Sequence, residues 1–137
     1  MIEIVDYRAD WIAEFERVAE GLRDVLPESV IRIDHIGSTA VPLLCGKNVI
    51  DVQVTVAALD PDIAGRLLAA GYTAFPQITH DHVPPGYEGS HEDWATFFFT
   101  QPIGQRRANV HVRQAGRANQ RYALLFRDFL RADRSTA

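Results

Sequence analysis

Apolar side chains recur along this chain at two spacings, one typical of helices and one typical of strands. Residues 11–26 repeat large apolar side chains every three or four positions, which predicts an amphipathic helix. A second helix is predicted to open at Asp60-Pro61 and to stop at Gly71, because aspartate caps helices, proline suits the first helical position, and glycine suits the end. A third apolar stripe predicts a helix over about residues 117–131.

Shorter segments rich in β-branched and aromatic residues are predicted as strands, at residues 2–6, 30–36, 48–56, 72–77, 94–101 and 106–113. Residues 78–93 hold many Pro, Gly and His residues and predict a long loop. The order β-α-β-β-α-β-loop-β-β-α mixes helices with hairpins. It favours an α+β fold with a mixed sheet, and the length suits a single domain over residues 1–137.

Two of the predicted strands each present one apolar and one polar face. In one strand Ile50, Val52, Val54 and Val56 oppose Asp51, Gln53 and Thr55, and in the other Ala108, Val110 and Val112 oppose Arg107, Asn109, His111 and Arg113. We therefore expect the helices to cover the apolar face and the polar face to remain an open groove. A solvated antiparallel sheet would show the same alternation without any function. Aspartate is nevertheless disfavoured in a strand, so Asp51 needs a reason.

Charge and cysteine content narrow the classes of partner. The net charge of −4 and the pI near 5.7 argue against bulk binding to nucleic acid or to an anionic membrane. Cys45 is the only cysteine, which fits a reducing compartment, and no apolar run approaches the length of a membrane span. We therefore expect a cytoplasmic protein with no nucleic-acid and no membrane partner.

The segment "IDHIGSTAVPLLCGKNVIDVQV", residues 33–54, carries the chemistry of a phosphate site. Gly37 allows a phosphate to approach the backbone, while Ser38 and Thr39 add hydroxyl donors beside main-chain amides. Lys47 can supply a cation, and Asp51 a hard oxygen ligand for Mg²⁺ that bridges to phosphate oxygens. A Gly-Ser turn alone is weak support, because most such turns only reverse the chain.

Four motifs resemble one known family: "HIGSTAVP" (35–42), "K..IDV.V" (47–54), "VHV" (110–112) and "LLFRDFLRA" (124–132). Together they are similar to the GrpB family, which is placed in the nucleotidyltransferase superfamily. The resemblance implies a nucleotidyltransferase-like mixed β-sheet and a nucleotide, or another phosphate-bearing small molecule, as the ligand. It also implies that Gly37 and Ser38 hold the phosphates and that Asp51 is the first metal-binding carboxylate.

The sequence departs from active members of that superfamily, which carry a second carboxylate two residues after the first. Here the pair is Asp51-Val52-Gln53, and the later strand offers Asn109 and His111 in place of a third carboxylate. Two Mg²⁺ ions about 4 Å apart repel strongly and need several anionic ligands, so a two-metal mechanism is disfavoured.

One divalent cation is therefore expected, Mg²⁺ or Mn²⁺ on Asp51, with Zn²⁺ shared by Asp51 and His111 as the less favoured alternative. Asp51 and His111 are the candidate catalytic residues, with His111 as metal ligand or general base. Gln53 and Asn109 would line the groove, and Arg107 would meet phosphate.

Other polar clusters have plainer interpretations beside the functional one. His80-Asp81-His82 and His91-Glu92-Asp93 stand at the two ends of the long loop. They form either a metal or acid–base cluster folded over the groove or, as we favour, solvated loop residues. His35 falls on the apolar face of its strand, so we expect it to make a hydrogen bond in the core. Arg127-Asp128 is interpreted as a structural pair.

Three functions remain open from the sequence. The first is an enzyme that transfers a nucleotidyl or phosphoryl group. The second is a binding module that holds a nucleotide or another small anion without catalysis. The third is an accessory interaction domain, since GrpB-like domains occur fused to a kinase of coenzyme A biosynthesis. The missing second carboxylate favours the last two, and the superfamily favours the first.

Overall fold

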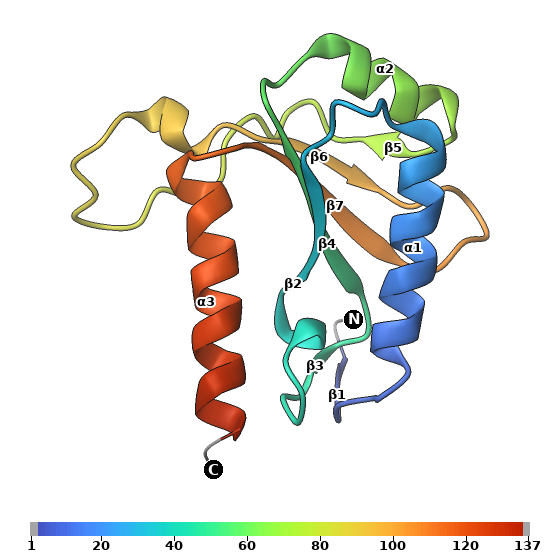
Figure 1. Ribbon diagram of the computed structural model, residues 1–137, viewed down its shortest axis with the longest axis vertical. Coiled ribbons are helices and arrows are strands. Elements are labelled where there is room, and N and C mark those ends of the chain that lie inside the picture. Colours follow the sequence, from blue (N-terminus) through green and yellow to red (C-terminus); the bar gives the residue numbers. More distant parts are fainter. Residues whose placement is uncertain (1–2, 136–137) are drawn as a thin grey trace.

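The computed structural model describes residues 3–135 and combines three α-helices with strands and two short 3-10 turns (Figure 1). Along the chain the elements are β1 Ile4–Val5, α1 Trp11–Val25, β2 Arg32–Ile36, η1 Ser38–Ala40, β3 Gly46–Lys47, β4 Ile50–Val56, α2 Pro61–Ala69, β5 Thr73–Ala74, η2 His91–Trp94, β6 Phe97–Thr100, β7 Ala108–Gln114 and α3 Ala118–Ser135.

The centre of the fold is a five-stranded sheet in the order β2-β4-β7-β6-β5. The strands β4 and β7 run parallel, and all other neighbours in this sheet run antiparallel. A two-stranded sheet of β1 and β3 lies at one end. The expected α+β fold with a mixed sheet is therefore confirmed.

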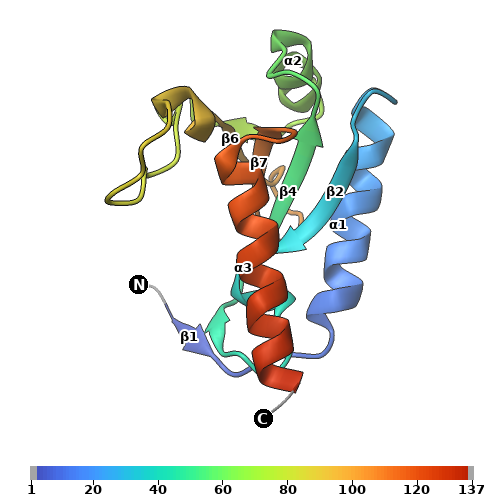
Figure 2. The same cartoon turned by 60° about the vertical axis from the view of Figure 1, so that its left-hand side comes forward.

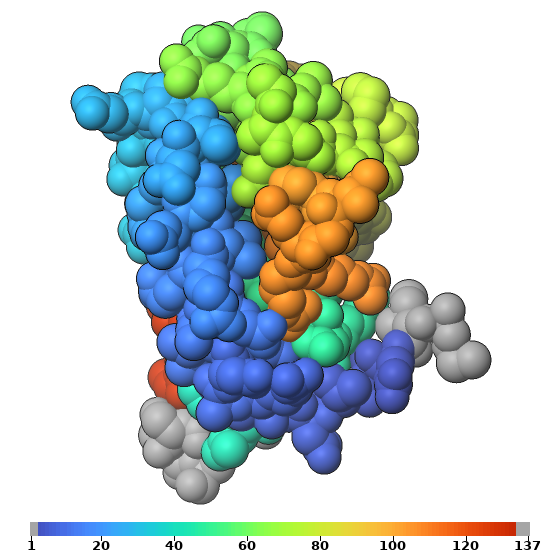
Figure 3. Space-filling model, turned by 90° about the vertical axis from the view of Figure 1, so that its right-hand side faces the viewer, coloured from blue at the N-terminus to red at the C-terminus, as the bar shows by residue number. Residues whose placement is uncertain are grey.

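The helix α1 covers one face of the sheet, as its apolar spacing predicts. Trp11, Phe15, Ala19 and Leu22 are its buried residues, and they join the apolar side chains of β4 and β7 in one core. Figure 3 shows this face closed by α1 in blue and by the α2 region in green, with the segment around residues 101–107 in orange beside them. Asp60 caps α2 by accepting a hydrogen bond from the amide of Asp62, and Pro61 follows as predicted.

The helix α3 lies against the opposite face of the sheet, which corrects the expectation of helices on one face only (Figure 2). Its first turn covers one end of the polar face, where Gln53 and Thr55 are buried. The apolar residues of its stripe stay exposed instead: Tyr122, Leu125, Phe126 and Phe129. The reason lies in Asn119 and Gln120, which are buried and bond to polar partners on the sheet side.

Several predicted boundaries were too generous. The first strand is only Ile4–Val5, and residue 2 lies outside the described residues. The strand predicted over 72–77 shortens to Thr73–Ala74, and the one predicted from 94 begins at Phe97 because η2 takes His91–Trp94. Within residues 3–135, no helix has both the length and the apolar content needed to cross a membrane. A single domain over residues 1–137 stays a prediction.

Candidate functional site

The Gly-Ser turn and Asp51 lie directly against each other. The pairing of β2 with β4 sets Ile36 opposite Asp51, so the turn begins beside the carboxylate. Gly37 has φ 74° and ψ −174°, a region that only glycine occupies readily. A Cβ at residue 37 would stand 2.7 Å from Asp51 Oδ2, so a side chain would also collide with the carboxylate. Glycine is therefore required here by both backbone conformation and close approach.

The Asp51 side chain points along the polar face toward β7. Its Oδ1 accepts a hydrogen bond from Asn109 Nδ2 at 3.2 Å and lies 3.5 Å from His111 Nε2. The side chain is 23% exposed, so it lies at the edge of the groove and not in packed hydrocarbon. The structure thus brings together Gly37, Asp51, Asn109 and His111.

The surroundings of His111 bear on its role as a metal ligand. Arg113 Nη2 lies 3.4 Å from His111 Nδ1, and a guanidinium can only donate. This contact favours the tautomer that carries its proton on Nε2, facing Asp51. A metal on Nε2 would move the proton to Nδ1, where it would meet the N–H of Arg113. Asp51 alone therefore fits a cation better than the Asp51–His111 pair does.

Ser38 and Thr39 point to different sides of the turn. A Cβ on Gly46 would stand 2.1 Å from Ser38 Oγ, so the serine side chain lies over the glycine of β3, next to exposed Lys47. Thr39 is buried, and its hydroxyl lies 2.8 Å from His35 Nε2. The expectation that Thr39 contacts phosphate is therefore corrected, because its hydroxyl faces the core.

His35 makes its hydrogen bond on the core side of the turn, to Thr39, as its position on the apolar face predicts. Its ring stacks on Phe15 with 4.7 Å between centroids. Burial lowers the pKa of His35 to about 4, and the nearby Arg131 and Arg127 cations add to the effect. The imidazole is therefore neutral near pH 7 and acts as a structural hydrogen-bonding group.

A cavity of about 340 Å³ opens beside the turn and is bounded by Gly37 and Ser38, by α3 and by the long loop. Arg127 lines it, donates to the His35 carbonyl and lies 3.5 Å from Asp34. Arg131, one helical turn later, donates to the Ala40 carbonyl. No sequence motif marks these two arginines as ligand-binding residues. Their spacing of four residues was visible, but which face of α3 meets the turn was not.

Gln53 does not line the groove, which corrects the prediction. It is fully buried; its Nε2 donates to the Gln120 carbonyl and its Oε1 accepts from Arg113. Arg113 also forms an ion pair with Asp81 of the long loop, in which Nε donates to Oδ2 at 3.1 Å and Nη2 donates to Oδ1 at 3.0 Å. Asn119 Nδ2 donates to the same carboxylate. This chain of polar contacts fastens the loop and α3 to the sheet.

Arg107 is exposed and directly precedes β7, where its carbonyl accepts the amide of Ile50. By alternation its side chain shares a face with Asn109.

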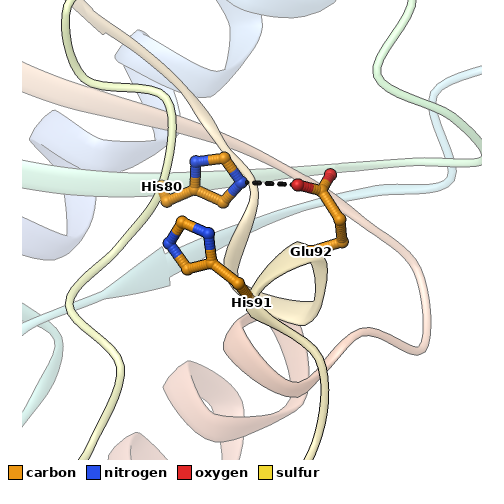
Figure 4. A group of neighbouring side chains, drawn as sticks. All are labelled: His80, His91 and Glu92. Atoms are coloured by element: carbon orange, nitrogen blue, oxygen red, sulfur yellow. Dashed lines mark hydrogen bonds and ion pairs between the residues drawn. The ribbon is translucent and has the colours of Figure 1, made fainter.

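Each of the two polar clusters at the ends of the long loop is divided, because its side chains point to different parts of the structure. Asp81 and His82 line the cavity beside the turn. Asp93 instead caps η2 and accepts from Tyr87. His80, His91 and Glu92 come together elsewhere (Figure 4). Within residues 3–135 they are the only His, Cys and carboxylate side chains that gather as three or more potential metal ligands.

Comparisons with known proteins agree on one family. The family model described as "GrpB protein" matches residues 1–137. The chain is 37% identical over 137 residues to the dephospho-CoA kinase of Mycobacterium tuberculosis, covering 90% of this chain but 34% of that protein. It is 35% identical over 134 residues to UPF0157 protein SCO7215 of Streptomyces coelicolor, covering 96% of this chain and 62% of that protein.

Solved structures agree with the fold. The conserved protein GrpB from Enterococcus faecalis superposes with a TM-score of 0.73 at 26% identity, over 97% of this chain and 74% of that chain. The Cid1 poly(U) polymerase bound to MgATP superposes with a TM-score of 0.58 at 12% identity, over 92% of this chain and 38% of that chain. The second likeness extends to the fold alone. The chain spans about a third of the length of the first curated relatives that it matches.

Proposed function

The chain belongs to the GrpB family, and from that premise we propose that it binds a nucleotide or another phosphate-bearing small molecule between the Gly37-Ser38 turn and Asp51. The observation that carries the proposal is the contact of Asp51 with Gly37, because Gly37 in turn lines the cavity together with Arg127. The turn thus offers a backbone without a side chain, with a carboxylate on one neighbour and a cation lining the adjoining cavity. These are the groups that phosphate recognition through one metal ion requires.

The ligand would enter the cavity with its phosphates toward the turn. Arg127 is suited to this because a guanidinium pairs with two phosphate oxygens at once. It is now held by Asp34 at 3.5 Å and by Asp128 at 3.0 Å, and a phosphate would compete with these carboxylates. Lys47, next to Gly46, and Arg107, on the same strand face as Asn109, would add exposed positive charge.

One divalent cation, Mg²⁺ or Mn²⁺, would bind Asp51 together with phosphate oxygens and water. A hard cation prefers such oxygen ligands, and the tautomer of His111 leaves Asp51 as the protein ligand that fits best. The chemistry that the ion supplies is charge neutralisation on the phosphates. Structurally related Cid1 binds MgATP, which is consistent with this assignment.

Nucleotidyl or phosphoryl transfer is the second candidate function, favoured by the fold shared with Cid1. The position of the second carboxylate argues against it, because Gln53 is neutral and its amide is engaged by Arg113 and Gln120. An accessory role is the third candidate. It draws on the dephospho-CoA kinases, of whose length this chain covers about a third. Binding without transfer is the function that the geometry supports best.

The test is thermal unfolding with ATP, GTP, CTP and UTP, each with and without Mg²⁺ or Mn²⁺. A ligand at ten times its Kd stabilises the protein by about 1.4 kcal/mol, which raises Tm by a few degrees for a chain of this size. We expect a metal-dependent rise in wild type that Asp51→Asn abolishes. The control Asp62→Asn removes an exposed carboxylate on α2 and should leave the rise intact.

Two outcomes would overturn the proposal: no nucleotide or inorganic phosphate raises Tm, or the rise survives in Asp51→Asn at full size. A rise without metal that Arg127→Gln abolishes would replace metal-assisted binding by plain anion binding. Release of pyrophosphate from the bound nucleotide in the presence of acceptors would identify transfer.

A further inference from the structure

A second cluster of metal-binding side chains lies apart from the Asp51 groove, at the base of the long loop. His80 precedes Asp81 in an extended segment that bridges to Ala95, so their side chains point to opposite sides. Asp81 turns toward Arg113 and Asn119, whereas His80 turns toward Glu92. Glu92 and His80 border another cavity, of about 490 Å³, that α2 residues and the Phe97–Phe99 run also line.

The three side chains lie close enough to reach one ion after a rotation of one stacked histidine ring, because a metal ion lies in the plane of each ring that binds it. His80 Nε2 lies 2.9 Å from Glu92 Oε1, and one ligand atom from each of His80, His91 and Glu92 lies within 4.8 Å of the others. The rings of His80 and His91 are nearly parallel, at an interplanar angle of 15° and 3.9 Å between centroids. Figure 4 shows both rings beside the Glu92 carboxylate, from the two ends of the loop over residues 78–93.

Hydrogen bonds fix the backbone on both sides of the cluster. Ser90 and Asp93 form a reciprocal capping box at η2, the turn that carries His91 and Glu92. Arg117 donates to the Glu92 carbonyl, and the Thr96 amide donates to the Thr79 carbonyl. These contacts fix the two backbone segments in place, which lowers the entropy lost when an ion is bound.

The group behind His80 suits a metal ligand. Thr79 Oγ1 lies 2.9 Å from His80 Nδ1. Metal-binding histidines usually engage the second ring nitrogen in such a contact, and a hydroxyl can either donate or accept. When an ion replaces the proton on His80 Nε2, the ring can carry its proton on Nδ1 instead. The Thr79 hydroxyl donates to Nδ1 before this change and accepts from it afterwards.

We propose that His80, His91 and Glu92 bind one Zn²⁺ ion, with water completing the coordination. Two imidazoles and one carboxylate form a ligand set that zinc accepts with a fourth position open, whereas Mg²⁺ prefers oxygen ligands alone. The site is separate from the cation expected at Asp51, so the two can be tested independently.

The experiment is titration of metal-free protein with Zn²⁺ and Co²⁺ by calorimetry and by visible absorption of bound cobalt. Wild type should bind one ion per chain, with Mg²⁺ in excess having no effect. His91→Ala and Glu92→Gln should each weaken Zn²⁺ binding at least tenfold, and Thr79→Val should weaken it about tenfold because it acts through the orientation of His80. Circular dichroism of these surface variants checks that the fold is kept.

Two controls isolate the site. His82→Ala removes an exposed histidine from the same loop but outside the cluster, and Asp51→Asn removes the groove carboxylate. Both should bind Zn²⁺ like wild type. Binding that is lost in Asp51→Asn and kept in His91→Ala would overturn this assignment and locate the ion in the groove. Failure of wild type to bind Zn²⁺ or Co²⁺ would overturn it as well, with no bearing on nucleotide binding.

Discussion

The substitution Gly37→Ala is the most direct test of the contact between the turn and Asp51. Gly37 combines φ 74° with ψ −174°, so an alanine there costs about 1–3 kcal/mol of backbone strain. The new methyl group would also lie 2.7 Å from Asp51 Oδ2 and 3.0 Å from Asp51 Cβ. Crowding of that kind adds about 1 kcal/mol or more when the neighbour must move. We expect a total loss of about 2–4 kcal/mol in urea unfolding, together with loss of the metal-dependent response to nucleotide.

A double-mutant cycle separates the two contributions. Asp51→Ala removes the carboxylate that the new methyl group would meet, so Gly37→Ala should cost about 0.5–1 kcal/mol less in that background. Gly104→Ala is a useful second comparison, because Gly104 has φ 82° but no atom within 4 Å of the added Cβ. It should destabilise the protein while leaving nucleotide binding intact. A coupling energy near zero, with nucleotide binding unchanged in Gly37→Ala, would refute the contact between the turn and Asp51.

Three further predictions address the parts that support the site. Since the folded-state pKa of His35 is about 4, below its ordinary value of 6.5, protonation favours unfolding, and stability should fall by about 3 kcal/mol as pH drops from 7 to 4. Urea unfolding of His35→Gln should lack this slope between pH 6.5 and 5. Asp81→Ala should cost about 2–3 kcal/mol by leaving the Arg113 cation unpaired, and hydrogen exchange in residues 78–93 should rise, whereas Glu88→Ala changes neither. Arg127→Gln should weaken nucleotide binding by about 1–2 kcal/mol in calorimetry, and an unchanged Kd would remove Arg127 from the site.

The sequence predicted the elements that depend on local pattern. The spacing of Trp11, Phe15 and Leu22 identified α1 and its buried face, and the alternation in β4 identified Asp51 as a polar residue on a rigid strand. The nearness of Asp51 to Gly37 followed from the antiparallel pairing of β2 with β4. Each of these features is set by residues close together in the chain or by one strand pairing.

What the sequence did not predict depends on the placement of α3. Its apolar stripe suggested packing on the core, yet Leu125 and Phe129 are exposed and the polar Asn119 and Gln120 are buried. Buried amides need hydrogen-bond partners. Gln120 Nε2 donates to Thr55 Oγ1 on the sheet and Asn119 Nδ2 donates to Asp81 on the loop, so satisfied polar contacts decide the orientation of the helix. The ligand role proposed for Arg127 follows from that placement of α3 and from no local signal. The meeting of His80 with His91 was one of two sequence interpretations, and the bridge of His80 to Ala95 brings it about.

The polar face of the sheet is therefore divided into two parts with different tasks. At one end, Gln53 and Arg113 are bound to each other and tied to α3 and the long loop. At the other end, Asp51 remains partly exposed beside Gly37. A carboxylate in place of Gln53 would lie 2.9 Å or so from a guanidinium that is itself paired with Asp81, and that cation would oppose a metal ion there. The neutral amide at residue 53 thus belongs to a set of contacts that closes this end of the face, and an acid placed at that one position would not by itself create a metal site.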